Sequence, residues 1–284
     1  MEPKETLIGF IGQGWIGKNY ANDFEQRGYR VIRYCLEMPE NKEKIKDCDL
    51  VFIAVPTPTT PAGFDDSILR QVIKLVGDNK TAIIKSTILP GTTESIQKEN
   101  PNIYVLHSPE FLTEANAAYE AAHPNRNIIG LPIMNEEYQK RAAAVMAVLP
   151  QAPYQLICQA QEAELIKYAG NCYLYFKVIF ANIFYEVSEK LGCDWEIIKK
   201  SLVADPRIGN SHLQPIFQGG RGAGGHCFIK DFAAFLQLQS QITEDKCGTD
   251  VLKAIEKKNI DLLTKSHNYL DLLADVYGED IIKE

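Results

Sequence analysis

Near its N-terminus the sequence reads Thr6-Leu7-Ile8-Gly9-Phe10-Ile11-Gly12-Gln13-Gly14-Trp15-Ile16-Gly17. Its apolar first half predicts a strand, G-x-G-x-x-G follows directly, and residues 17–27 look helical. A strand, a glycine turn and a helix in this order form the dinucleotide-binding fingerprint, in which the pyrophosphate meets N–H groups at the helix N-terminus. Such glycines also serve plain turns, but the preceding strand favours a cofactor site. The expected cofactor contacts are Gly12, Gln13, Gly14, Trp15, Ile16 and Gly17.

The anchor for the cofactor ribose is displaced from its usual place. An acidic residue about 20 positions further on normally ends the second strand and holds the ribose hydroxyls. Here the second predicted strand, residues 30–36, ends with Cys35 at the place of that acid and Glu37 two residues later. Glu37 is either the ribose ligand or a solvated loop residue. Arg33 also admits a phosphorylated ribose, so the sequence favours NAD over NADP only modestly.

Strand-like and helix-like segments alternate through the first half of the chain. Strands are predicted at 6–11, 30–36, 49–55, 81–85, 103–107 and 127–130, and helices at 17–27, 66–76, 92–99 and 136–148. This alternation predicts an α/β fold: a doubly wound, Rossmann-like parallel sheet with both faces covered, over residues 1–155.

The second half, residues 156–284, reads as a helical domain. A long helix over 161–191 is too apolar for one exposed face, so we expect it between domains or against another subunit. A helix over 195–203, a glycine-rich loop to Gly225 and helices over 228–241 and 249–276 follow.

Composition excludes several classes of function. The 284 residues are 45% hydrophobic, enough for a proper core. A net charge of −7 and a pI near 5.4 argue against nucleic-acid binding, and no basic block suggests a membrane surface. No signal-peptide core or spanning segment is apparent, so we expect a cytoplasmic protein. The seven cysteines are scattered without a C-x-x-C pair, which supports neither a metal site nor a disulfide framework.

Loops after three predicted strands carry polar side chains. They hold Pro56 and Thr57, then Thr87, then the run Ser108-Pro109-Glu110-Phe111-Leu112-Thr113-Glu114 with its two carboxylates. Open α/β sheets bind ligands at the carboxyl ends of their strands. Prolines and hydroxyls also make ordinary turns, and a loop carboxylate is usually solvated. The position at the sheet edge nevertheless favours cofactor contacts at the first two loops and a catalytic carboxylate at the third.

One cysteine stands in a context that predicts reactivity. The sequence Gly224-Gly225-His226-Cys227-Phe228-Ile229-Lys230-Asp231 places Cys227 in the first turn of a helix if one begins there, where the dipole favours a thiolate. Most cysteines are simply buried. In the long helix, Glu164, Lys167 and Asn171 lie at helical spacing and form either a solvated stripe or part of a buried site.

Together these segments resemble the nucleotide-sugar dehydrogenases, specifically the UDP-glucose 6-dehydrogenase branch, from about residue 7 to 238. Several of that family's patterns recur in its order. G-G-x-C-x-x-K-D is matched by Gly224, Gly225, Cys227, Lys230 and Asp231, E-L-x-K-x-x-x-N by Glu164, Leu165, Lys167 and Asn171, P-E-F-L-x-E by Pro109, Glu110, Phe111, Leu112 and Glu114, S-T-x-x-P-G-T by Ser86, Thr87, Pro90, Gly91 and Thr92, and R-I-G-N by residues 207–210.

The resemblance implies a four-electron oxidation of a UDP-sugar's primary alcohol to a carboxylate with two NAD. It implies that Cys227 forms a thiohemiacetal and then a thioester, with Lys167 and Asn171 stabilising the oxyanion. Asp231 would position a water or handle a proton, Glu114 would be the general base, and Thr87 would assist near the nicotinamide. Lys230 joins the implied cofactor contacts, and the implied substrate contacts are Phe111, Leu112, Glu114, Lys167, Asn171, Arg207 and Gly224.

The resemblance also implies a homodimer built on the long helix. The family's second nucleotide-binding domain, which closes over the uridine diphosphate, is expected to be missing from this short form. Two other hypotheses therefore stay open. One is a two-electron hydroxyacid dehydrogenase of the 6-phosphogluconate type, which needs no cysteine. The other is a module that binds a nucleotide or a sugar nucleotide without turnover.

Overall fold

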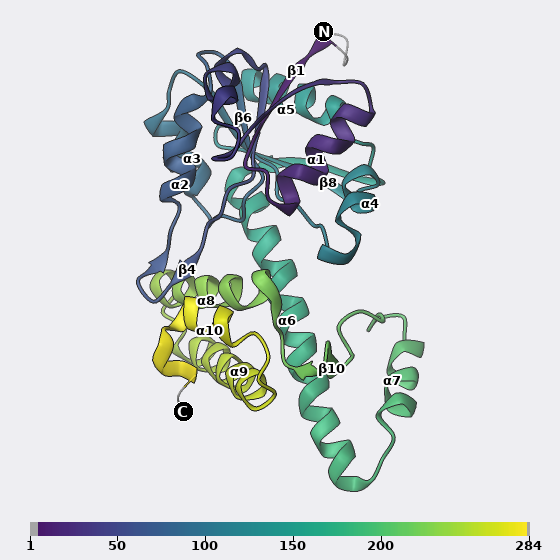
Figure 1. Ribbon diagram of the computed structural model, residues 1–284. Helices are drawn as coiled ribbons and strands as arrows, with labels where there is room; N and C mark the ends of the chain where they lie inside the picture. Colours follow the sequence, from purple (N-terminus) through teal and green to yellow (C-terminus); the bar gives the residue numbers. More distant parts are fainter. Residues whose placement is uncertain (1–4, 283–284) are drawn as a thin grey trace. The chain divides into compact units, whose positions relative to one another are not determined.

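The computed structural model describes residues 5–282 and divides them into two compact units (Figure 1). The first unit comprises the described residues up to Thr57 together with Asp65–Lys167. The second comprises Pro58–Phe64 and the described residues from Tyr168 onward. In the part of the chain that the structure describes, no helix is both long and apolar enough to cross a bilayer.

A mostly parallel, seven-stranded sheet forms the centre of the first unit, so the predicted α/β class is confirmed. Its strand order is β2-β1-β3-β6-β7-β8-β9, and β2, β1, β3, β6 and β7 run parallel. Their carboxyl ends therefore meet at one edge. The strands are β1 Leu7–Ile11, β2 Arg30–Tyr34, β3 Leu50–Ile53, β6 Thr81–Ile84, β7 Tyr104–His107, β8 Arg126–Leu131 and β9 Tyr154–Gln159.

Two features of this sheet differ from the prediction. The strands β7 and β8 pair antiparallel, at His107 and Gly130, whereas a wholly parallel sheet was predicted. The edge strand β9 was not predicted, because its sequence YQLICQ has only a short apolar run between two glutamines. It pairs parallel with β8 along its full length.

Helices cover both faces of the sheet. Figure 1 shows α1 and α4 on one side and α2 and α3 on the other. An aromatic cluster lies under α1, where Phe10 stacks on Phe52 at 5.1 Å between ring centroids and Phe24 meets both rings. These helices are α1 Trp15–Gln26, α2 Ser67–Val72, α3 Thr92–Glu99, α4 Ala117–Ala122 and α5 Glu136–Val148, with 3₁₀ segments at Pro39–Asp47, Ile73–Leu75 and Glu114–Asn116.

The second unit is helical and contains two small hairpins. Its core includes a parallel stack of Tyr175 on Phe232, with centroids 4.1 Å apart. The long helix α6, Ala160–Leu191, begins in the first unit and continues into the second. The other elements are α7 Trp195–Ala204, α8 Gly225–Ile242, α9 Lys246–Lys265, α10 Leu270–Tyr277, a 3₁₀ segment Glu279–Ile282, and the hairpins β4 Thr59–Thr60 with β5 Gly63–Phe64 and β10 Ile216–Phe217 with β11 Gly220–Arg221.

The single helix predicted over 249–276 is wrong, because a turn divides it into α9 and α10. His267 and Tyr269 both take the left-handed backbone region, with φ of 53°. The turn residues Ser266 and Asn268 between the helices are the kind that end a helix rather than extend it. The loop predicted to run unbroken to Gly225 also contains the short β10–β11 hairpin.

Candidate active-site residues

The loop between β1 and α1 has the geometry that a bound dinucleotide requires. Gly12 has φ of +90°, and a Cβ there would lie 2.1 Å from the Ala54 carbonyl oxygen. A Cβ on Gly17 would lie 2.0 Å from the Gly12 carbonyl oxygen, so both positions demand glycine. Gly14 caps α1 and has open space where a Cβ would lie. The first N–H groups of a helix lack intrahelical partners, so this end suits a pyrophosphate.

The residues around the predicted ribose anchor lie after β2. Glu37 is exposed, and a hydrogen bond from the Cys35 thiol lowers the pKa of its carboxyl. Arg33, the residue that admits a phosphorylated ribose, is held by Glu25, with 2.7 Å between Nη2 and Oε2. It also donates to Asn22 at 2.8 Å. A guanidinium committed to these partners favours an unphosphorylated ribose.

Hydrogen bonds tie together the loops after β3 and β6. The Thr57 hydroxyl donates to the Thr87 carbonyl at 2.7 Å, and the Ser86 hydroxyl donates to the Val55 carbonyl at the same distance. Thr57 and Thr87 are buried, whereas the predicted cofactor contact Pro56 is exposed. The structure therefore brings two of the predicted loop residues together at the carboxyl edge of the sheet.

A buried ion pair joins the loop after β7 to α6. Lys167 Nζ lies 2.8 Å from Glu110 Oε1, and it donates to the Glu110 carbonyl at the same distance. The other carboxylate oxygen of Glu110 accepts the Leu112 N–H at 2.7 Å. Glu114 instead lies exposed in a 3₁₀ turn. The carboxylate beside Lys167 is therefore Glu110, whereas the resemblance implied Glu114 as the general base.

Three more polar side chains lie around the Lys167–Glu110 pair, and all three are buried. Lys85 follows β6, is 4% exposed and donates to the Ser108 hydroxyl at 3.3 Å and the Pro109 carbonyl at 3.5 Å. Its Nζ lies 4.5 Å from the centroid of the Tyr20 ring. Burial is the main cause that lowers the pKa of Lys85 to about 7, with Lys167 adding to the shift. Burial also lowers the pKa of His107 to about 3, so this imidazole is neutral.

Glu164 has a structural task. Its carboxylate accepts the Gly91 N–H at 2.6 Å, the Thr93 N–H at 2.8 Å and the Thr93 hydroxyl at 2.5 Å, so it caps α3 from α6. Burial raises the pKa of Glu164 to about 7, although these donors oppose the shift. The family pattern that contains Glu164 and Lys167 thus places a residue that caps α3 one helical turn before the lysine of the buried ion pair.

The second unit holds the cysteine and the residues around Asp231. Cys227 is the third residue of α8 and half-buried, so its predicted place in a first helical turn is confirmed. Asp231, one turn later, is 1% exposed. Its carboxylate accepts from Asn171 Nδ2 at 2.6 Å and pairs with Lys230 Nζ at 2.5 Å. Three predicted site residues are therefore in direct contact.

Two predicted substrate contacts lie in very different surroundings. Gly224 packs so closely on Tyr269 that a Cβ would lie 2.0 Å from the ring. Arg207 is exposed and pairs with Asp205 at 2.6 Å. In the first unit, Phe111 and Leu112 are half-buried, and the Arg126 guanidinium lies 3.6 Å from the Phe111 ring centroid.

Among the described residues, no cluster of three or more His, Cys, Asp or Glu side chains could hold a metal.

Sequence reasoning did not identify Lys85 or Asn259, and it offered Glu110 only as one of two carboxylates in the loop after β7. Lys85 directly precedes the Ser-Thr pair, but a lysine after a strand is usually solvated. Asn259 hydrogen bonds to the backbone of Ala223, a contact between residues 36 positions apart in the sequence. Only the fold brings such residues together, so no local pattern could reveal Asn259.

Comparison with known proteins agrees with this geometry. Residues 35–149 match the NAD binding domain of the UDP-glucose/GDP-mannose dehydrogenase family, and residues 161–261 match its central domain. The first match begins after the glycine loop, whose fingerprint is therefore independent support for NAD as the cofactor.

Individual relatives and structures point the same way. YtcA of Bacillus subtilis (strain 168) is 35% identical over 234 residues, covering 78% of this chain and 52% of that protein. UDP-glucose 6-dehydrogenase YwqF of the same organism is 31% identical over 230 residues, covering 76% and 49%. A UDP-glucose dehydrogenase structure from Pyrobaculum islandicum superposes with a TM-score of 0.77 at 25% identity, over 96% of this chain and 71% of that one.

The chain spans about half the length of the curated relatives it matches. Both family domains are found in the expected order, and together they cover the strands β3 to β8, the long helix from residue 161 onward and the cysteine loop. The chain therefore belongs to the UDP-glucose/GDP-mannose dehydrogenase family.

Proposed function

We propose that this protein oxidises the primary alcohol of a nucleotide sugar, with UDP-glucose as the expected substrate, to the carboxylate. One observation carries the proposal. Cys227 lies in the first turn of α8, and Asp231 one turn later is held by Asn171 and Lys230. A thiol at a helix N-terminus beside a fixed carboxylate suits a covalent step better than simple binding.

NAD is the cofactor of the proposed reaction, and when bound it supplies the hydride acceptor. Residues 12–17 would hold its pyrophosphate, since Gly12 and Gly17 permit the tight turn. Gly14 has no side chain to block access to the N-terminus of α1. Glu37 is the proposed ribose ligand. Thr57, Thr87 and the exposed Pro56 would contact the cofactor at the sheet edge. We assign the cofactor role to residues 1–155 and the substrate and dimerisation roles to residues 156–284.

The first oxidation removes a hydride and a proton from the alcohol and yields an aldehyde. We assign the proton transfer to Glu110, because its carboxylate is buried and hydrogen bonded to Lys167, whereas Glu114 is exposed. The Lys167 ammonium would also stabilise negative charge on the sugar oxygen. We assign Glu114 to a contact with the substrate, together with Phe111 and Leu112.

The second oxidation passes through Cys227. Its sulfur adds to the aldehyde carbon and the thiol proton ends on the oxygen. The resulting thiohemiacetal then loses a second hydride from its carbon and the proton from its hydroxyl group, which gives a thioester. A water then attacks the thioester carbon, the C–S bond breaks, and the carboxylate and the thiol are released. Asp231 would position this water, while Lys230 and Asn171 keep its carboxylate in place. The whole reaction consumes one sugar, one water and two NAD.

A homodimer built on α6 belongs to the same proposal. Several large apolar side chains of this helix are exposed at spacings of three, four and seven residues, which place them on one face. A long apolar stripe of this kind marks an interaction surface. A second copy of the helix would offer the same stripe, as the two-fold symmetry of dimers requires. The stripe consists of Tyr173, Phe180, Phe184, Val187 and Leu191, each at least 45% exposed.

The yield of reduced cofactor per sugar tests the proposed reaction. With limiting UDP-glucose and excess NAD, we expect about two NADH per sugar, because two hydrides leave the same carbon. A yield of one would mean an aldehyde or ketone product and would rule out the thioester. A Cys227→Ser variant that keeps the full turnover rate, with one NADH per substrate, would favour the hydroxyacid dehydrogenase hypothesis. Cofactor binding without reduction, with UDP-glucose and other sugar nucleotides alike, would favour a binding module.

A further inference from the structure

The backbone just before Cys227 is held by a side chain of α9. The Ala223 N–H donates to Asn259 Oδ1 at 2.6 Å, and Asn259 Nδ2 donates to the Ala223 carbonyl at 3.0 Å. Asn259 and Ala223 are each 1% exposed. One buried carboxamide therefore satisfies both backbone groups of a single residue, which fixes the position and the orientation of that peptide.

Residues 220–225, called the glycine turn below, are also shaped by close packing. A Cβ on Gly222 would lie 2.9 Å from Asn259 Oδ1, and one on Gly220 would lie 2.2 Å from Asn268 Nδ2. These contacts come from α9 and from the turn after it. The glycines allow this approach because they lack side chains. The C-terminal half of α9 and the turn after it thus determine the backbone conformation of the glycine turn.

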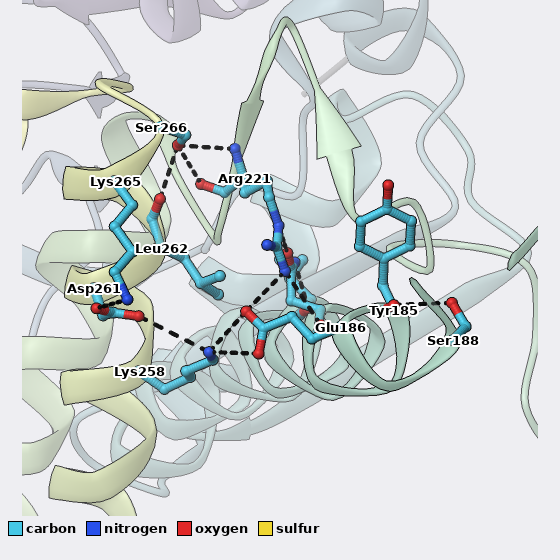
Figure 2. A network of polar contacts seen from close by, with 11 residues as sticks. Tyr185, Glu186, Ser188, Arg221, Lys258, Asp261, Leu262, Lys265 and Ser266 are labelled. Atoms are coloured by element: carbon cyan, nitrogen blue, oxygen red, sulfur yellow. Dashed lines mark hydrogen bonds and ion pairs between the residues drawn. The ribbon is translucent and has the colours of Figure 1, made fainter. Parts of the chain in front are cut away.

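A second set of contacts anchors Arg221, at the start of the same turn (Figure 2). Its backbone N–H donates to the Ser266 hydroxyl at 3.0 Å, while its side chain donates to Asn182 at 2.9 Å and Glu186 at 3.1 Å. Lys258 holds both oxygens of Glu186 at 2.9 Å. The glycine turn is therefore tied to both α6 and α9.

We propose that Asn259 is a positioning residue for Cys227, acting through the backbone of Ala223. Only Gly224 separates Ala223 from α8, and the first residue of that helix, Gly225, with φ of +82°, has open space where a Cβ would lie. Because Gly224 and Gly225 carry no side chains, the entry of the chain into α8 is set by the packing of Gly224 on Tyr269 and by the two hydrogen bonds at Ala223. The inference rests on the proposed role of Cys227, and it adds a residue that never touches the substrate.

The test compares two matched amide-to-carboxylate variants of the full chain. Asn259→Asp keeps an oxygen that accepts from Ala223 but replaces the donor to its carbonyl with a second oxygen. Gln97→Glu is the control, because Gln97 is also buried and bridges backbone groups, in the first unit. The readout is the rate of iodoacetamide alkylation at Cys227, measured by peptide mapping, relative to the exposed Cys193 in the same sample.

In Asn259→Asp we expect Cys227 alkylation to slow about fivefold or more, because a misplaced first turn loses its support of the thiolate. We expect kcat to fall about tenfold or more with a nearly unchanged KM for NAD, since small displacements of reacting groups are costly. Gln97→Glu should lower the melting temperature without changing the Cys227 to Cys193 ratio. An unchanged ratio in Asn259→Asp would overturn the proposal.

Ser266→Ala keeps the inference testable if Asn259→Asp does not fold. It removes one acceptor from the same turn, so we expect a smaller change in the same direction at Cys227. An alkylation rate of Cys227 equal to that of the parent chain would contradict the proposal that contacts to the glycine turn position Cys227. Alkylation needs no turnover, so absence of NAD reduction in the parent protein would disprove the proposed function while the ratio still decides the role of Asn259.

Discussion

Lys167 binds both the side chain and the backbone of Glu110. Its Nζ lies 2.8 Å from the carboxylate Oε1 and 2.8 Å from the carbonyl oxygen, and both side chains are at most 5% exposed. One ammonium group thus neutralises a buried carboxylate and fixes the loop that carries it. Removing either partner would leave the other charge buried and unpaired, which is costly.

Glu110 and Glu114 can be separated by a pair of isosteric variants. We expect Glu110→Gln to lower kcat about 10²-fold or more, the usual cost of removing a general acid or base. Glu114→Gln should retain most of the activity, because Glu114 is exposed. The measurement is steady-state NADH formation with saturating UDP-glucose. Equal losses in both variants, or a larger loss at Glu114, would return the proton transfer to Glu114.

Lys85 should make stability depend on pH above neutrality. Burial lowers its pKa to about 7 from an unfolded value of 10.5, so between these values the unfolded chain binds more protons and stability rises with pH. The slope is at most about 1.4 kcal/mol per pH unit, so the parent should gain roughly 1–2 kcal/mol over Lys85→Met between pH 7.5 and 9. Urea unfolding at both pH values measures this difference. The titratable neighbours of this position are the same in the parent and the variant, so their contributions to the pH dependence largely cancel. These neighbours are Glu110, Lys167, His107 and Tyr20. Parallel curves of stability against pH would show that Lys85 stays charged in the folded parent.

Glu164 should matter to folding more than to chemistry. In Glu164→Gln, one carboxylate oxygen is replaced by an NH₂ group, which faces the N–H groups at the start of α3 and cannot accept from them. We expect this change to lower the free energy of unfolding by about 1–3 kcal/mol. Activity per folded molecule should remain close to that of the parent. Glu162→Gln is the control, because this exposed residue lies on the same helix. A variant of unchanged stability but lost activity would assign Glu164 a chemical role.

Disrupting the apolar stripe of α6 should dissociate the proposed dimer. Phe184→Glu introduces a charge at a residue that is 50% exposed in the single chain and would be covered in the dimer. Sedimentation equilibrium should show a dimer for the parent and a monomer for the variant. Glu189→Lys, an exposed position off the stripe, should leave the dimer intact. A monomeric parent protein would disprove this part of the proposal.

Local patterns predicted the elements that have strong local signals. The glycine loop, β1, the long helix α6 and the start of α8 near Cys227 follow from glycine spacing and from hydrophobic periodicity. The strand β9 was not predicted, because its short apolar run lies between two glutamines. The division of α9 from α10 depends on left-handed residues at His267 and Tyr269. Tertiary packing selects these conformations.

The candidate site shows the same limit. Motifs named Cys227 and Lys167, but the choice of Glu110 over Glu114 depends on which carboxylate is buried beside Lys167. That information is not in the order of the residues, since both glutamates follow the same strand. The Asn259 contact to Ala223 depends in addition on how α9 packs against the glycine turn.

The first turns of α6 carry three separate connections on one short stretch of helix. Glu164 caps α3, Lys167 binds Glu110, and Asn171 binds Asp231. Inserting one residue between Glu164 and Lys167 would rotate everything beyond it by about 100° and break at least one of these connections. This stretch should therefore tolerate changes of residue type at its exposed positions, but not changes of length. In related chains, insertions and deletions should accumulate instead in the exposed connection between α8 and α9, at residues 243–244.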